Sequence, residues 1–308
     1  MSVLTLGETM GRLSPPGIGP LHLQRSLDLS IAGAESTVAI GLQRLGHRTT
    51  FVTRLGDDEL GRLVRSTLLA EGVQVAAGTD PDAPTGLLLN ERRTADVRRV
   101  QYLRAGSAAS LLSPDDVAEI DWETVELVHL TGITPALSAT ARDCFEAALA
   151  QATERGVPVS LDVNYRSRLW TRAEARAVLA SAARSCAVVF ASTDELDLLT
   201  VDAADQLLGG AVREVVVTDG ARGSVAWTRE GRTSAPARAV TAVDTTGAGD
   251  AFVAGYLSAR LDGADVAGRL ARGSAVAAFG VGTQGDWEGL PRRAELALLE
   301  ADDGHVAR

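Results

Sequence analysis

Short apolar strands alternate with helical segments along most of the 308-residue chain. Residues 3–6 predict a short buried strand, and residues 49–54 predict a second strand. Apolar residues at helical spacing follow each of them, over 36–45 and over 60–68. An order of strand, helix, strand, helix favours an α/β fold with a parallel sheet. The same patterns predict further strands at 125–130, 157–164, 187–191, 214–218 and 225–228, and helices at 137–154 and 265–281.

A glycine-rich stretch, residues 243–249, runs directly into the apolar segment 251–257, which predicts a buried helix. The first N–H groups of a helix have no partner within it, and glycines carry no side chain to keep an anion away. Asp250 stands in the first turn, where its carboxylate repels a phosphate. The presence of a carboxylate at this position is explained if Asp250 takes the proton of an attacking hydroxyl. The alternative is that Asp250 only complements the helix dipole, worth ~0.3–1 kcal/mol.

Composition and charge argue against several classes of protein. The net charge of −10 disfavours a nucleic-acid or acidic-membrane partner, and no apolar run approaches the ~20 residues of a membrane span. All 30 basic residues are arginine, so a Walker-type phosphate loop and Schiff-base chemistry are excluded. Cys144 and Cys186 are expected to be reduced core residues, and the four histidines lack zinc-ligand spacing. We expect a soluble, cytoplasmic protein.

Residues 244–252, Asp-Thr-Thr-Gly-Ala-Gly-Asp-Ala-Phe, resemble the C-terminal signature of the ribokinase-like (PfkB) carbohydrate kinases. The resemblance implies a three-layer αβα core with a mostly parallel sheet, formed by residues 1–308 as a single domain. It also implies that backbone groups of the glycine-rich loop hold developing phosphate charge, while a carboxylate acts as the catalytic base. The residues concerned are Gly247, Ala248, Gly249 and, as the base, Asp250.

Residues 32–61 resemble the N-terminal signature of the same family, with two departures. Ala32 stands where a glycine is usual, and Thr37 stands where asparagine is frequent. Strands predicted within 84–106 are expected to pair with residues 10–32 in a small projecting sheet. The family uses such a lid to cover its sugar and often to dimerise, so the resemblance implies a homo-oligomer, at least a dimer. The alternative is an ordinary surface hairpin.

Ser192 and Glu195 have the spacing of a capping box, which predicts the start of a helix. The family has Asn-x-x-Glu here, so the resemblance implies that Glu195 acts on Mg²⁺ through water, with Ser192 replacing the asparagine. A glycine turn after the strand 214–218 resembles the nucleotide-binding turn, and the small residues of 265–281 suit an adenine. The implied cofactors are ATP and Mg²⁺, with a monovalent cation as a further candidate. The implied ATP-binding residues are Asn164, Ser192, Thr218, Gly220, Arg222 and Gly223.

Two arginines bear on the acceptor, Arg104 on the predicted lid and Arg166 at the edge of the predicted sheet. A neutral sugar does not need a guanidinium group, whereas arginine can hold the carboxylate of a sugar acid with paired hydrogen bonds. A single arginine is, however, most often a surface residue. The segments around both arginines, and residues 285–289, resemble 2-keto-3-deoxygluconate kinases. That resemblance implies a sugar-acid pocket lined by Gly33, Tyr102, Arg104, Ile133, Arg166 and Asp286.

The expected reaction is transfer of the ATP γ-phosphate to a hydroxyl of a sugar acid, 2-keto-3-deoxygluconate. One alternative is a kinase of the same family that acts on fructose or a pentose, which leaves the arginines without a carboxylate. Another is a non-catalytic sugar-binding protein, against which the intact Asp250 argues. A nicotinamide dehydrogenase is disfavoured because Phe252 stands where the dinucleotide fingerprint requires glycine or alanine.

Overall fold

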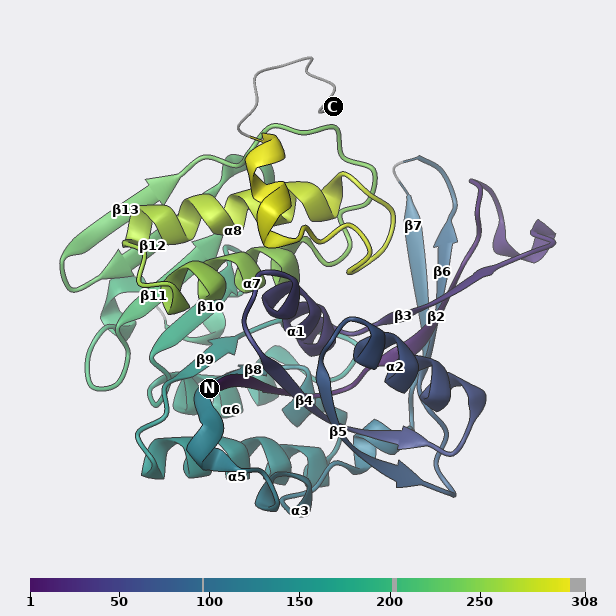
Figure 1. Cartoon of the computed structure of the whole chain (residues 1–308), viewed down its shortest axis with the longest axis horizontal. Coiled ribbons are helices and arrows are strands. Elements are labelled where there is room, and N and C mark those ends of the chain that lie inside the picture. The colour runs from purple at the N-terminus through teal and green to yellow at the C-terminus, as the bar shows by residue number, and fades with distance from the viewer. Residues whose placement is uncertain (96, 201–203, 300–308) are drawn as a thin grey trace.

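The computed structural model describes residues 1–95, 97–200 and 204–299. Within them a nine-stranded sheet forms the centre of the molecule, in the order β13-β12-β11-β10-β9-β8-β1-β4-β5 (Figure 1). Pairing is parallel from β5 to β11 and antiparallel for β12 and β13 at one edge. The strands are β1 (Ser2–Leu6), β4 (Thr49–Gly56), β5 (Gln74–Asp80), β8 (Val125–Thr131), β9 (Val159–Asp162), β10 (Val188–Ser192), β11 (Glu214–Thr218), β12 (Ser224–Thr228) and β13 (Gly231–Ala235).

Helices cover both faces of this sheet, which gives the predicted three-layer α/β architecture (Figure 1). On one face α5 and α6 bury Phe145 and Leu179 against the strands. On the other face α1, α7 and α8 bury Leu42, Tyr256 and Leu270. The α-helices are α1 (Ala34–Arg44), α2 (Glu59–Ala70), α3 (Asp115–Ala118), α4 (Thr134–Leu137), α5 (Ala139–Glu154), α6 (Arg172–Ala183), α7 (Ala248–Leu261) and α8 (Val266–Val281).

A second, four-stranded sheet projects from the body, as the sequence predicts (Figure 1). Its order is β3-β2-β6-β7, with β2 (Met10–Ser14), β3 (Asp28–Ala32), β6 (Leu87–Arg92) and β7 (Arg98–Leu103). We call it the lid sheet. The hairpins β2/β3 and β6/β7 are antiparallel, and β2 joins them by pairing with β6 in parallel.

The prediction of a helix that starts at Ser192 is wrong. A short 3₁₀ turn, Leu196–Leu198, stands there instead. The Glu195 carboxylate accepts the N–H of Ser192 at 2.8 Å, as a cap does, but also the N–H of Tyr165 at 2.7 Å. The carboxylate therefore ties the end of β10 to the neighbouring segment after β9, and no α-helix follows it. The helix predicted from 137 begins at Ala139 within the described structure.

The carboxyl ends of the central parallel strands meet at one edge of the sheet. β9 ends at Asp162, two residues earlier than predicted, and Asn164 beyond it adopts a left-handed backbone with φ of +39°. Cys144 and Cys186 are both buried and free, as predicted. In the described part of the chain, no helix has the length and apolar character that crossing a membrane requires.

Candidate active site

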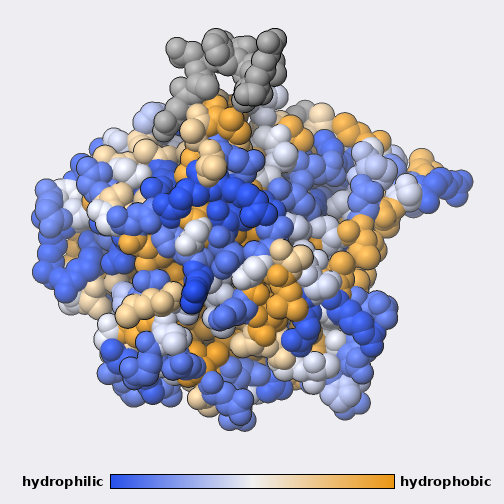
Figure 2. Space-filling view, viewed as in Figure 1, coloured by the Kyte–Doolittle hydropathy of each residue, from blue (hydrophilic) through white to orange (hydrophobic). Residues whose placement is uncertain are grey.

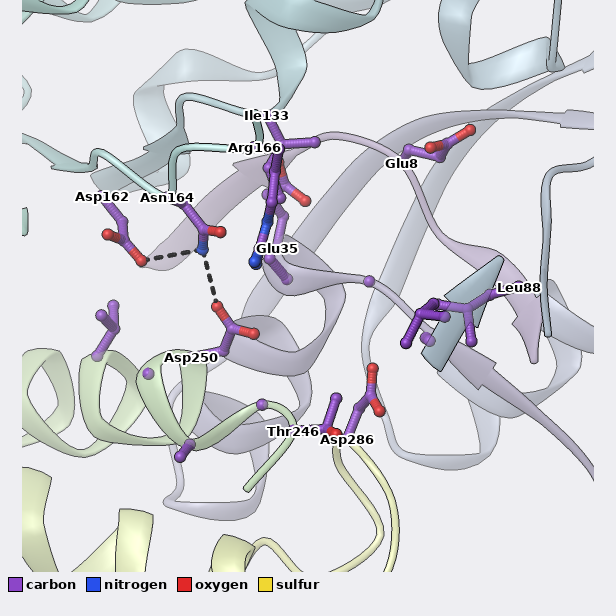
Figure 3. A pocket seen from close by; sticks show the side chains of 18 of the residues that line it. Glu8, Glu35, Leu88, Ile133, Asp162, Asn164, Arg166, Thr246, Asp250 and Asp286 are labelled. Carbon is purple, nitrogen blue, oxygen red and sulfur yellow. Dashed lines mark hydrogen bonds between the residues drawn. The ribbon is translucent and has the colours of Figure 1, made fainter. Parts of the chain in front are cut away.

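A cavity of about 350 Å³ lies between the carboxyl ends of the parallel strands, the start of α7 and the lid sheet. Figure 3 shows Asp250, Asn164 and Asp162 on one side of it, and Glu8 and Leu88 on the opposite side. The lining is unusually rich in charge. It includes the carboxylates of Glu8, Glu35, Asp162, Glu195, Asp250 and Asp286 and the guanidinium groups of Arg12, Arg104 and Arg166.

Asp250 is a buried carboxylate in the first turn of α7. Gly247, just before the helix, has φ of +72°, a conformation that glycine adopts without strain. The Asn164 side-chain amide donates hydrogen bonds to Oδ1 of Asp250 at 3.2 Å and to Oδ2 of Asp162 at 3.1 Å (Figure 3). One amide therefore fixes the orientation of two carboxylates, and the left-handed backbone of Asn164 places it between them.

Burial raises the pKa of Asp250 to about 6, although the charge of Arg166 and the hydrogen bond from Asn164 oppose the shift. Burial, with the charges of Glu195 and Asp250, also raises the pKa of Asp162 well above its usual value. Carboxylates crowded in this way favour a bound cation. Among the described residues, no three side chains are arranged to hold a metal ion directly.

Arg104, at the end of the lid strand β7, already has a carboxylate partner. Its Nη2 lies 2.5 Å from Oε2 of Glu8, whose side chain is fully buried. The other oxygen of Glu8 accepts the hydroxyl of Ser107 at 2.5 Å, and the Arg104 guanidinium stacks over the ring of Tyr102 at 5.4 Å. The positive charge of Arg104 is thus largely neutralised inside the protein.

Arg166 differs, because it follows the end of β9 on an exposed segment and forms no ion pair with any described residue. Its charge acts on Asp250 and Asp162, where it lowers the pKa of both carboxyl groups against the effect of burial. Arg166 is therefore the lining guanidinium that is free to bind an incoming anion.

Asp286 reaches the cavity from the loop after α8, beside Thr246 (Figure 3). Burial raises the pKa of Asp286 to about 7, although Arg12 opposes the shift from 3.7 Å away. Arg12 comes from lid strand β2 and is buried, and the sequence analysis did not identify it. The only local signal is a charged residue within an otherwise apolar strand.

Glu35, in the first turn of α1, is a second lining residue that was not predicted from the sequence. Its Oε1 accepts the hydroxyls of Thr131 at 2.5 Å and Thr134 at 3.0 Å. Burial outweighs these hydrogen bonds and raises the pKa of Glu35 to about 7. The site therefore contains several carboxyl groups that change protonation between weakly acidic and neutral pH.

A second cavity, of about 570 Å³, adjoins the first and shares Thr218, Thr245, Ala248 and Gly249 with it. Small and apolar residues dominate its lining, and a Cβ built at Gly249 meets no atom within 4 Å. The remaining members include Gly220, Ala221, Gly223, Ala237, Ala239, Val240, Ala242, Phe252, Ala277, Ala278 and Val281. The small residues predicted in 265–281 therefore do face a cavity.

The structure brings the predicted residues together around these two cavities, with one exception. Arg222 lines neither of them; it is exposed and pairs with Asp219, with Nε 2.6 Å from Oδ2. The first cavity is lined by Gly33, Tyr102, Arg104, Ile133, Asn164, Arg166, Ser192, Glu195, Thr218, Gly247, Ala248, Gly249, Asp250 and Asp286. The second adds Gly220 and Gly223.

The pfkB family carbohydrate kinase model matches residues 1–293. A 2-dehydro-3-deoxygalactonokinase of Haloferax volcanii is 37% identical over 98% of each chain. A fructokinase of Klebsiella pneumoniae is 34% identical over 83% of each chain. The crystal structure of a 2-dehydro-3-deoxygluconokinase of Thermotoga maritima superposes with a TM-score of 0.85 and 28% identity, over 97% of this chain and 98% of the other.

The chain therefore belongs to the pfkB family of carbohydrate kinases. It is a sugar kinase, that is, a phosphotransferase with an alcohol group as acceptor, and the family implies ATP as phosphate donor. The fold class predicted from the alternation of strands and helices is confirmed by this membership and by the superposition.

Proposed function

We propose that the protein phosphorylates a hydroxyl of a 2-keto-3-deoxy sugar acid, with 2-keto-3-deoxygluconate as the acceptor. The observation that supports this most directly is Arg166, which lines the same cavity as the buried carboxylate Asp250 and forms no ion pair within the described part of the chain. A guanidinium in this position suits a carboxylate on the acceptor, with which it forms charge-assisted hydrogen bonds. Relatives named for kinases of such acids support the same choice.

Asp250 is the proposed general base. Its carboxylate takes the proton of the acceptor hydroxyl, and the amide of Asn164 holds it in the orientation that this transfer needs. The backbone N–H groups of Gly247, Ala248 and Gly249 lie at the start of α7, where they stabilise negative charge on the transferring group. Bound ATP and Mg²⁺ supply the phosphoryl group and neutralise its charge.

The second cavity is the proposed nucleotide site. It adjoins the start of α7 and is larger than the acceptor cavity. Small apolar residues such as Ala277 and Val281 line it and suit the flat ring of an adenine. The open space at Gly249 and Gly220 leaves room for phosphates beside the backbone. Glu195 is proposed to act on magnesium through water. A monovalent cation and a role for Arg222 in phosphate binding stay predictions from the sequence.

The lid sheet is proposed to hold two copies of the chain together. Apolar residues gather on the projecting part of the surface (Figure 2). Leu27, Leu29 and Leu103 are all more than a third exposed there, although they belong to, or adjoin, regular strands. A second lid sheet laid against this surface covers them, which suits a homodimer.

A neutral-sugar kinase is the second candidate, and the 34% identity with a fructokinase favours it. Purified protein should be assayed by coupled ADP release with 2-keto-3-deoxygluconate, its galacto epimer, fructose and ribose. A kcat/KM for either keto acid well above that for both neutral sugars supports the proposal. A preference for fructose or ribose refutes it, and no turnover with any of the four favours a non-catalytic binding protein.

A further inference from the structure

Asp244 is a fully buried carboxylate at the start of the loop that leads into α7. Its Oδ1 accepts the backbone N–H of Thr246 at 3.0 Å and the hydroxyl of Thr246 at 2.7 Å. Its Oδ2 accepts the N–H of Gly285 at 3.3 Å. One carboxylate therefore joins the two loops, 243–247 and 283–288, that border the proposed phosphate site.

The positive partner of Asp244 comes from the lid sheet. The Arg98 guanidinium on β7 forms an ion pair with Oδ1 of Asp244, and its Nη2 donates to the carbonyl of Val243 at 2.6 Å. Burial disfavours the charged form of Asp244, yet the hydrogen bonds from Thr246 and the charge of Arg98 outweigh it and hold the pKa of Asp244 below its usual value. A cation from the lid thus stabilises a carboxylate of the phosphate loop.

Strand β7 connects this pair to the acceptor cavity. Side chains two apart on a strand share a face, so Arg98 lies on the face that also carries Val100 and Tyr102. Both of those residues line the acceptor cavity, whereas Arg99 points to the other face and is exposed. An acceptor that contacts Val100 or Tyr102 therefore contacts the same strand, and the same face of it, as Arg98.

The second loop touches the start of α7 directly. A Cβ built at Gly247 lies 2.5 Å from the carbonyl oxygen of Asp286, so the two backbones are in close contact. Arg12 of the lid strand β2 lies 3.8 Å from Asp244, 3.7 Å from Asp286 and 3.6 Å from Glu288. The lid sheet therefore contacts both loops beside Gly247.

We propose that Arg98 is a positioning residue that ties the phosphate-holding loop 243–249 to the lid sheet, so that the loop is ordered for transfer when β7 lies against it. The inference rests on the proposed function for its kinetic consequence. Its structural content, an ordering of residues 243–249 by Arg98, does not depend on which sugar is phosphorylated. Lid and loop then respond together to the acceptor, although Arg98 itself touches neither reactant.

Hydrogen exchange on the free protein tests the structural part. Amides of 243–249 should exchange at least ~10-fold faster in Arg98→Gln than in the unmodified protein, because the loop loses its tie to the lid. The matched control is Arg99→Gln, next on the same strand but on its exposed face, which should leave these amides unchanged. Equal exchange in Arg98→Gln and the unmodified protein overturns the inference, whatever the enzyme's substrate proves to be.

Kinetics test the consequence. Arg98→Gln should lower kcat by roughly 10- to 100-fold with little change in the KM for ATP, and guanidinium ion should restore part of it where tetramethylammonium at equal ionic strength does not. A kcat within twofold of the unmodified enzyme, or no rescue, contradicts the inference.

If Arg98→Gln fails to fold, a double variant with Arg98→Gln and Asp244→Asn replaces it, because the second substitution removes the buried charge that the first leaves unpaired. That double variant should still show the faster exchange, and normal exchange in it overturns the inference.

Discussion

The two adjoining cavities are built by different means. The proposed acceptor cavity contains nine charged side chains, which come from the strand ends, α1, α7, the loop after α8 and the lid sheet. The proposed nucleotide cavity is lined mainly by glycine, alanine and valine, with two threonines, two serines, Phe252 and, as its one charged residue among those described, Arg238. The first cavity therefore offers charged groups to a ligand, whereas the second offers mainly small and apolar surface.

This difference decides how each side responds to substitution. In the first cavity several charged side chains are buried, and where two of them form a pair, removal of one leaves the other uncompensated. Arg104 and Glu8 show this arrangement, with 2.5 Å between Nη2 and Oε2. In the nucleotide cavity little depends on any one polar contact, and a change of volume matters more. The variants below separate these two kinds of effect.

Asp250→Asn should have the largest effect, a loss of ~10²-fold or more in kcat, because the general base is removed. The fold should persist, since the oxygen of the new amide can still accept the hydrogen bond from Asn164. Steady-state kinetics with a thermal melt of the same preparation checks this. Near-normal turnover in a folded variant reassigns Asp250 to complementing the helix dipole.

Arg166→Leu should lower kcat/KM for the keto acid by roughly 10- to 150-fold, the loss of one charge-assisted hydrogen-bonded pair. The kcat/KM for a neutral sugar should fall much less, and the KM for ATP should barely change. Arg104→Leu should lose less activity on the acid but lower the melting temperature, because buried Glu8 loses its cation. Equal losses on acid and neutral acceptors contradict the carboxylate contact.

Activity should fall by about tenfold for each pH unit below ~6, because burial raises the pKa of Asp250 to about 6 and only the ionised form accepts a proton. At the ordinary pKa of an aspartate the same fall begins about two units lower. Since Glu35 has a pKa of about 7 in the same cavity, Glu35→Gln is the control. A pH profile of kcat/KM that keeps its acid limb in Glu35→Gln shows that Glu35 does not cause that limb, and a profile that loses its acid limb in this variant contradicts the assignment to Asp250.

Ala277→Leu tests the nucleotide side. The larger side chain reduces the second cavity and should raise the KM for ATP by roughly 10- to 30-fold, within the ~1–3 kcal/mol typical of overpacking. The KM for the keto acid should stay the same, the reverse of the pattern for Arg166→Leu. A common change in both constants means that the two cavities are not independent.

The features that sequence predicted best are those encoded in consecutive residues. The loop before α7 is an example, because glycine backbone chemistry and the following apolar helix are both local. The central strands were also predictable, since buried parallel strands are continuous apolar runs. Edge strands β5 and β13 were missed because much of each is exposed, and α6 was missed although Thr171 and Glu174 form a capping box.

Pairings between distant segments could not be predicted from the same patterns. Arg12 and Arg98 meet Asp244 only once the lid sheet has folded against the body. Arg222 has the spacing of a phosphate-binding residue, but its guanidinium pairs with the neighbouring Asp219, so its role in phosphate binding stays a prediction. Spacing identifies which residues share an edge of the sheet, whereas the partner of each charge depends on tertiary packing.

Glu195→Gln should have the smallest effect, and it concerns the boundary between the two cavities. The variant keeps one acceptor oxygen, so it can satisfy the N–H of Ser192 or of Tyr165 but not both. If Glu195 also orders water around magnesium, half-saturation with Mg²⁺ should need about tenfold more ion, while the KM for the keto acid stays constant. A magnesium titration beside a thermal melt distinguishes the two roles. A lower melting temperature with an unchanged titration shows that Glu195 only joins the end of β10 to the segment after β9, and the carboxylates of Asp162 and Asp250 then remain to attract the ion.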